Sequence, residues 1–190
     1  MESKRESKGL GASTHRLSRR QFVVGTAATV GGAAMGVPSL ALSEASTPFQ
    51  LSSQASAALA ESPLVYISPL LAGGQESRCH GEVWFFADQG DVVIFTSKDS
   101  WKSRALTLKR NKARIWVGDF GPVWRALGRY RKAPTFLTQA EVDSSPATFD
   151  RLMADYSQRY ADEWGKWEPR FRKGYVNKTS ELIRYRPISA

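Results

Sequence analysis

Apolar positions from residue 63 onward follow two different periods, which together predict a mixed α+β domain. Short apolar, β-branched and aromatic runs are typical of strands, and they occupy 63–71, 81–87, 92–97, 113–118, 134–137 and 181–188. The turn-forming residues 88–91 join the second and third runs as a β-hairpin. No strand–helix–strand rhythm recurs, so we expect an antiparallel α+β domain of about six strands that form a barrel with helical cover.

Helical signals lie between and after these runs. Asp99 or Ser100 can cap a helix that starts near Trp101, and a short helix is expected over 53–60. Ser145-Pro146 is a typical helix start. Apolar side chains then recur every three or four residues, at Phe149, Leu152, Met153, Tyr156, Tyr160, Trp164 and Trp167. We expect Pro169 to end this helix, whose apolar face either covers the sheet or forms an aromatic cage for a ligand.

The first 45 residues have the pattern of an export signal. Arg19-Arg20 stands between Ser18 and Phe22, and an uncharged stretch rich in Gly and Ala follows as far as Leu42. Its glycines and Pro38 make it a poor membrane-spanning helix. The segment resembles a twin-arginine signal peptide. It therefore predicts export by the twin-arginine translocase to the periplasm or beyond, cleavage near residue 45, a linker over 46–62 and a folded domain over 63–190.

Charge narrows the range of ligands without selecting one. The chain has 27 Lys and Arg against 18 Asp and Glu. Six of these bases and three of the acids lie in 1–45, so the remainder carries +6. A net positive charge favours anionic ligands or anionic surfaces. We expect no nucleic-acid partner for an exported protein. We also expect no internal disulfide and no protein-built metal site, because residues 46–190 hold one cysteine, Cys79, and one histidine, His80.

The most informative stretch follows the strand at 92–97. The strand ends in Thr96 and Ser97, and Ser100 and Lys102 fall at the start of the next helix. Hydroxyl groups, free backbone N–H groups and a lysine near a helix start suit a phosphate group. An ordinary helix cap with a solvated lysine fits the same residues.

Residues 95–102, Phe-Thr-Ser-Lys-Asp-Ser-Trp-Lys, precede Leu106 and Asn111. This order resembles the pyridoxamine 5'-phosphate oxidase-like family of FMN-binding split barrels, which carries Phe-Tyr-Thr-x-x-x-Ser-x-Lys before a Leu and an Asn-Pro. Residues 80–85 are similar to a Val-Trp-Phe strand of that family, and 184–188 to its closing strand. The resemblance implies that the fold is an antiparallel, six-stranded split β-barrel with helical cover, and that the protein is a homodimer with FMN at the interface of two such barrels.

The resemblance also implies a set of cofactor-binding residues. Phosphate contacts fall to Thr96, Ser100 and Lys102, the 80–85 strand lies along the flavin ring, and Trp124 lies near a further contact. The full set is His80, Val83, Trp84, Phe95, Thr96, Ser97, Ser100, Lys102 and Trp124. No catalytic residue is implied. Oxidase members carry Arg and Lys where this chain has His80 and Phe85, so we do not expect oxidation of pyridoxamine phosphate.

Three functions remain open from the sequence. The first is an exported, FMN-dependent oxidoreductase of unknown small-molecule substrate, in which the flavin performs the redox chemistry. The second is a non-catalytic protein of the same fold that holds haem, with His80 as axial ligand, or another anionic ligand. The third is a partner subunit of an exported redox enzyme. Deazaflavin, or no cofactor at all, is an alternative to FMN.

Overall fold

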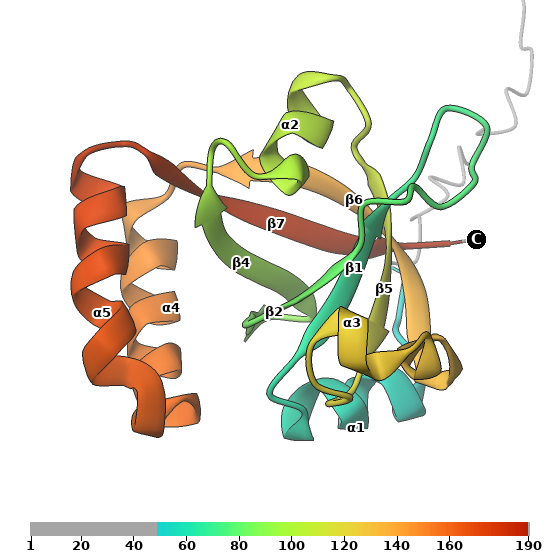
Figure 1. Ribbon diagram of the computed structural model, residues 1–190, viewed down its shortest axis with the longest axis horizontal. Helices are drawn as coiled ribbons and strands as arrows, with labels where there is room; N and C mark the ends of the chain where they lie inside the picture. Colours follow the sequence, from blue (N-terminus) through green and yellow to red (C-terminus); the bar gives the residue numbers. More distant parts are fainter. Residues whose placement is uncertain (1–48, 190) are drawn as a thin grey trace, which may run out of the picture. The chain divides into compact units, whose positions relative to one another are not determined.

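The computed structural model describes residues 49–189, so the predicted signal peptide lies outside the described residues. Strands and helices alternate irregularly along this part of the chain (Figure 1). In order, they are α1 (Ser53–Glu61), β1 (Val65–Pro69), β2 (Gly81–Val83), β3 (Phe86–Asp88), β4 (Asp91–Ser97), α2 (Trp101–Thr107), β5 (Lys112–Val117), α3 (Val123–Ala126), the 3-10 helix η1 (Arg129–Lys132), β6 (Thr135–Asp143), α4 (Pro146–Arg159), α5 (Ala161–Val176) and β7 (Ser180–Ile188).

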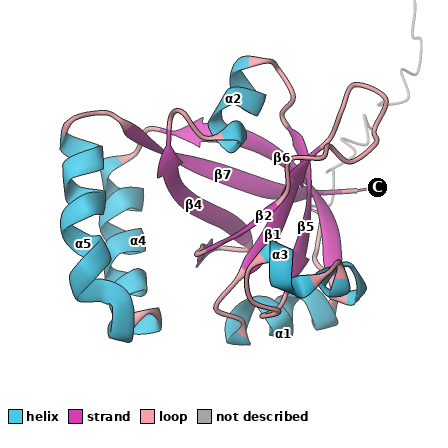
Figure 2. Ribbon diagram, viewed as in Figure 1, coloured by secondary structure: helices cyan, strands magenta, loops and turns pink. Residues whose placement is uncertain are grey.

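The strands form one curled antiparallel sheet of seven strands, in the order β2-β1-β5-β6-β7-β4-β3 (Figure 2). Its two edges, β2 and β3, are consecutive in the chain and separated only by Trp84 and Phe85. Three peptide units span at most about 11 Å. The edges therefore lie close together without pairing, which makes the sheet an open, split barrel. The predicted α+β antiparallel barrel is confirmed.

The strand count differs from the predicted six because the run at 81–87 is not one strand. It is interrupted at Trp84-Phe85, so that β2 pairs with β1 at one edge while β3 pairs with β4 at the other. Side-chain hydroxyls replace the missing ladder bonds here. The Phe85 N–H donates to the Tyr160 hydroxyl at 3.0 Å, and the Tyr156 hydroxyl donates to the Trp84 carbonyl at 2.9 Å.

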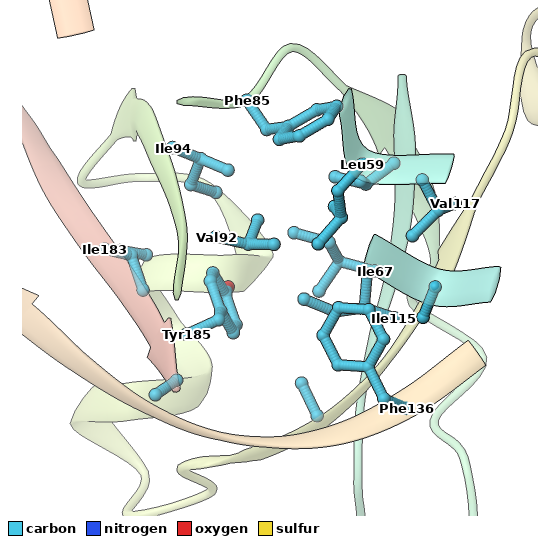
Figure 3. Packing of buried hydrophobic residues seen from close by; sticks show 14 residues of the cluster. Leu59, Ile67, Phe85, Val92, Ile94, Ile115, Val117, Phe136, Ile183 and Tyr185 are labelled. Atoms are coloured by element: carbon cyan, nitrogen blue, oxygen red, sulfur yellow. The ribbon is translucent and has the colours of Figure 1, made fainter. Parts of the chain in front are cut away.

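The barrel interior is filled by aliphatic and aromatic side chains from every part of the sheet (Figure 3). Phe85 enters this core from the interruption between β2 and β3 and is fully buried. The helix expected over 53–60 is confirmed as α1, whose Ala55 and Leu59 are buried in the same core. It closes one end of the barrel (Figure 1).

The helical region after residue 145 differs from the prediction. Ser145 caps α4, and Pro146 is its first residue, as expected. However, the helix ends at Arg159, and α5 then runs from Ala161 past Pro169 to Val176. The prediction that Pro169 ends the helix is wrong, because a proline removes one intrahelical hydrogen bond without necessarily stopping the helix. The break falls at Tyr160, whose hydroxyl holds the Phe85 backbone.

The face of α4 covers the outer side of the sheet, as the simpler of the two interpretations predicted. Its Phe149, Leu152, Met153 and Tyr156 are buried against Val93 of β4 and Leu182 of β7. The aromatic side chains of α5 lie farther along the same cluster and are only partly buried. None of the helices in the described part of the chain is long and apolar enough to cross a membrane.

A buried ion-pair network ties the last strand to the β3 edge. The Arg184 guanidinium contacts Asp88 at 2.6 Å, Asp91 at 2.9 Å and Asp143 at 2.9 Å. Burial by itself would raise the pKa of Asp88, but hydrogen bonds from Arg184 and Arg151 outweigh it and hold the pKa below its usual value. Burial also opposes the shift at Asp143, whose pKa is lowered by the Ser145 N–H and by Arg184.

Tyr160→Phe should lower the free energy of unfolding by about 1–3 kcal/mol, because it leaves the buried Phe85 N–H without its acceptor. Chemical denaturation would measure the change. Tyr185→Phe is the matched control, since the Tyr185 ring is equally buried but its hydroxyl makes no hydrogen bond within the described residues. Equal losses in the two variants would show that the Tyr160 hydroxyl does not stabilise the interruption.

Arg184→Gln should lower the free energy of unfolding by about 3 kcal/mol, because it leaves Asp143 without an ion pair and leaves Asp88 and Asp91 with only Arg151 and Arg186. The control is Arg186→Gln, two residues farther along the same strand, where the side chain is 56% exposed. It should lower the free energy of unfolding by less than about 1 kcal/mol. The lowered carboxyl pKa values stabilise the wild type above about pH 4, and this contribution is lost as the pH falls through the folded pKa values. Denaturation curves between pH 2 and pH 7 would contradict the assignment if both variants had the same acid profile.

Candidate functional site

The start of α2 has the predicted geometry. The helix begins at Trp101, and the Ser100 hydroxyl accepts the Ser103 N–H at 3.3 Å. Thr96 and Ser97 end β4 directly before this turn, and Thr96 lies opposite Glu181 of β7. Thr96 and Ser100 are partly exposed. Two hydroxyl groups that a ligand can reach therefore stand where a strand passes into a helix.

Lys102 is the unusual residue of this turn. It is only 9% exposed, its Nζ lies 4.3 Å from the centroid of the Trp101 ring, and no carboxylate within the described residues is near enough for an ion pair. Burial lowers its pKa to about 8, and the nearby charge of Glu82 offsets this only in part. The solvated-lysine interpretation of this helix start is therefore wrong.

The Trp101 ring brings α2 against β2. A Cβ atom placed on Gly81 would lie 3.6 Å from Cζ2 of Trp101, which is ordinary van der Waals contact. Glu82, the next residue, accepts the Val123 N–H at 3.0 Å and so also holds the start of α3. The two segments singled out from the sequence, 80–85 and 95–102, are thus neighbours in the fold.

A cavity of about 380 Å³, here called the aromatic cavity, opens between β2, Trp84 and α5. Its lining consists of Leu64, Glu82, Val83, Trp84, Phe95, Tyr156, Glu163, Trp167 and Phe171. One face of its central ring is occupied, because Trp84 stacks on Tyr160 at 4.1 Å with an interplanar angle of 2°. Three predicted site residues, Val83, Trp84 and Phe95, are therefore brought together in one apolar cavity of ligand size.

The other predicted site residues do not line this cavity. Ser97 is exposed, and its hydroxyl accepts the Asp99 N–H at 3.2 Å. The His80 ring lies 6.0 Å from Tyr130, and its Nδ1 is buried without a hydrogen-bond partner. Trp124 is 69% exposed on α3. A haem held by His80 would therefore lie outside the aromatic cavity.

Of the side chains that α5 contributes to the cavity, Trp167 belongs to the apolar face predicted from the sequence, whereas Glu163 and Phe171 were not predicted. Trp167 and Phe171 lie one helical turn apart and face the cavity, and the Glu163 carboxylate accepts the Trp167 Nε1–H at 3.1 Å. Their four-residue spacing was detectable. The expected helix end at Pro169 excluded Phe171, and the aromatic cage stood only as the alternative to a face that covers the sheet.

No protein-family description matches the chain, and no curated protein matches its sequence. Among solved structures, the chain is similar to HutZ, the heme storage protein from Vibrio cholerae, at 14% identity and a TM-score of 0.49, over 75% of this chain and 93% of that one. The chain is also similar to ChuZ from Campylobacter jejuni, at 14% sequence identity and a TM-score of 0.49, over 70% of this chain and 51% of that one.

A putative pyridoxamine 5'-phosphate oxidase from Listeria innocua gives 11% identity and a TM-score of 0.46, over 71% of this chain and 91% of that one. Even a shared fold does not imply a shared ligand. Function therefore has to be inferred from the residues of this chain.

Lys102→Met should raise the free energy of unfolding at pH 7 by up to about 3 kcal/mol, because it removes a buried charge of lowered pKa and keeps the side-chain volume. Because the pKa of Lys102 is lower in the folded than in the unfolded chain, its charge destabilises the folded wild type. This loss of stability is complete below about pH 8, shrinks as the pH rises, and vanishes above the unfolded pKa near 10.5. Denaturation at pH 7, 9 and 10.5 would measure it.

The matched control is Lys98→Met, at an exposed lysine just before the helix. This variant should show no gain at any pH. A Lys102→Met protein that is no more stable than the wild type at pH 7 would contradict the assignment of a buried, unpaired ammonium group.

Proposed function

We propose that the chain is an exported FMN-binding oxidoreductase, with the flavin phosphate at the start of α2 and the flavin ring in the aromatic cavity. One observation carries the proposal: Lys102 is a buried lysine without a carboxylate partner in the described structure. A buried, unpaired cation is destabilising unless a ligand supplies the opposite charge. Its lowered pKa is consistent with a group that an anion would restore to the charged form.

The surroundings of Lys102 suit a phosphate group. Ser100 and Thr96 offer hydroxyl groups on either side of the turn, and α2 begins there with its free N–H groups. Charge-assisted hydrogen bonds of this kind are stronger than neutral ones. The similarity of residues 95–102 to the phosphate-binding stretch of FMN-binding split barrels supports the same assignment.

The aromatic cavity suits the ring rather than the phosphate. Its walls are mainly aromatic, and its two charged lining residues, Glu82 and Glu163, are both acidic. These carboxylates would repel a phosphate and leave a neutral, planar ring as the better occupant. The charges therefore orient the cofactor, with the ring toward Trp84 and the phosphate toward Lys102.

A bound flavin supplies the redox chemistry, and the residues of this chain hold and shield it. No histidine or cysteine lines the cavity in the described structure. Burial raises the pKa of Tyr156 well above its usual value, so its hydroxyl stays protonated and keeps its hydrogen bond to the Trp84 carbonyl. The side chains thus bind the ring and exclude water. Export and a homodimer remain predictions from the sequence.

The proposal predicts that FMN binds more tightly than riboflavin, and that Lys102→Met removes this preference. Loss of one charge-assisted contact to the phosphate should weaken FMN about 10- to 100-fold and leave riboflavin unchanged. Fluorescence titration of the full chain with each flavin would measure both affinities. FMN affinity should also fall as the pH rises above about 8, where the Lys102 ammonium loses its proton.

Lys98→Met is the control and should bind both flavins as the wild type does. Trp84→Ala tests the ring site separately, because it should weaken both flavins alike. The proposal is wrong if the wild type binds neither flavin, or if it binds haem in their place. Equal affinity of FMN for the wild type and for Lys102→Met would contradict the assignment of the phosphate to the start of α2.

A further inference from the structure

The segment of α3 and η1 presents large apolar side chains to solvent from a rigid base. Trp124 is 69% exposed and Leu127 is 85% exposed, whereas Ala126 and Tyr130 between and after them are buried. Tyr130 stacks on Tyr66 of β1 at 4.5 Å with an interplanar angle of 9°. The segment packs on the outer side of β1 and β5 (Figure 1). Its buried residues fix the orientation of its exposed ones.

Leu127 has an unusual backbone conformation. Its φ of 48° and ψ of 37° lie in the left-handed region, and Gly128 follows with a φ of 78°. A branched apolar residue is rarely found there, whereas glycine and asparagine adopt this conformation readily. Neither packing within the chain nor backbone preference accounts for an exposed leucine at this position. A strained, exposed position of this kind points to a contact outside the chain.

Positive charge surrounds the two exposed apolar residues. Arg125, Arg129 and Lys132 are exposed, and no carboxylate within the described residues forms an ion pair with them. The Arg125 guanidinium lies 4.6 Å from the centroid of the Trp124 ring. Arg131 differs, because it pairs with Glu76 and packs over Trp116. The exposed surface of Trp124, Arg125, Leu127, Arg129 and Lys132 is called the basic tip below.

We propose that the basic tip attaches the protein to an anionic phospholipid surface. Exposed Trp and Leu side chains among unpaired cations are the combination by which peripheral proteins bind the interface of charged membranes. Burial of Trp124 and Leu127 among the headgroups removes apolar surface from water, and the three cations face lipid phosphates. A second copy fits less well, because a two-fold contact would set the three cations against their own copies.

The experiment is co-sedimentation of the full chain with vesicles of phosphatidylglycerol and phosphatidylcholine in equal parts, and with phosphatidylcholine alone. The wild type should partition to the anionic vesicles and be released by salt. Arg125→Gln, Arg129→Gln and Lys132→Gln together should lower the partition coefficient on the order of a hundredfold, at about fivefold per charge.

Leu127→Gly tests the apolar contact without risk to the fold, because glycine favours a positive φ. It should lower the partition coefficient about tenfold while the unfolding temperature stays the same or rises. Val176→Ser, at a 74% exposed position on α5, should change nothing. Lys98→Gln, Lys166→Gln and Arg170→Gln together remove the same net charge elsewhere and should cost far less than the triple variant of the basic tip.

A local signal separates the basic tip from any other part of the chain that binds lipid. Brominated lipid should quench the fluorescence of Trp124, measured as the difference between the wild type and Trp124→Phe. The proposal is overturned if Trp124 is not quenched, if neutral and anionic vesicles bind the protein equally, or if the control variants lose as much binding as the variants of the basic tip. It is also overturned if Leu127→Gly only dissociates an oligomer.

Discussion

The interruption between β2 and β3 is the constraint on which the rest of the structure depends. Two residues connect the opposite edges of a seven-stranded sheet, so the sheet has to curl until those edges are within reach of each other. Because successive side chains point to opposite faces, Phe85 enters the barrel and Trp84 stays outside. The Tyr160 hydroxyl accepts the Phe85 N–H and donates to the Pro63 carbonyl at 2.9 Å. This one side chain therefore joins the link to the segment that precedes β1.

The candidate site follows from the same link. Glu82 and Val83 precede it, Trp84 belongs to it, and the tyrosine that holds it stands directly before α5. The aromatic cavity therefore forms where one helix is fastened to the sheet edge. The Trp101 ring lies beside Gly81 of β2 and carries the Lys102 ammonium group over its face, while Glu82 and Val83 of the same strand line the aromatic cavity, so both halves of the proposed flavin site adjoin one three-residue strand.

Local signals in the sequence predicted the parts of this arrangement that depend on neighbouring residues. The Ser100 and Ser145 caps, the antiparallel strands and the covering face of α4 were all detectable. The interruption at Trp84-Phe85 was not, because residues 83–86 are uniformly apolar and carry no turn residue. The burial of Lys102 also depends on distant residues, so a lysine beside a helix cap looked solvated. Phe171 was missed because Pro169 was expected to end the helix.

The short edge strands have a further consequence for solubility. An exposed sheet edge is a template on which another chain can add a strand, and long edges invite aggregation. Both edge strands of this sheet are three residues long, and each adjoins the Trp84-Phe85 link. An incoming strand would find few free N–H and C=O groups in line on β2 or β3. The link that shapes the barrel thereby also protects it against edge-to-edge association.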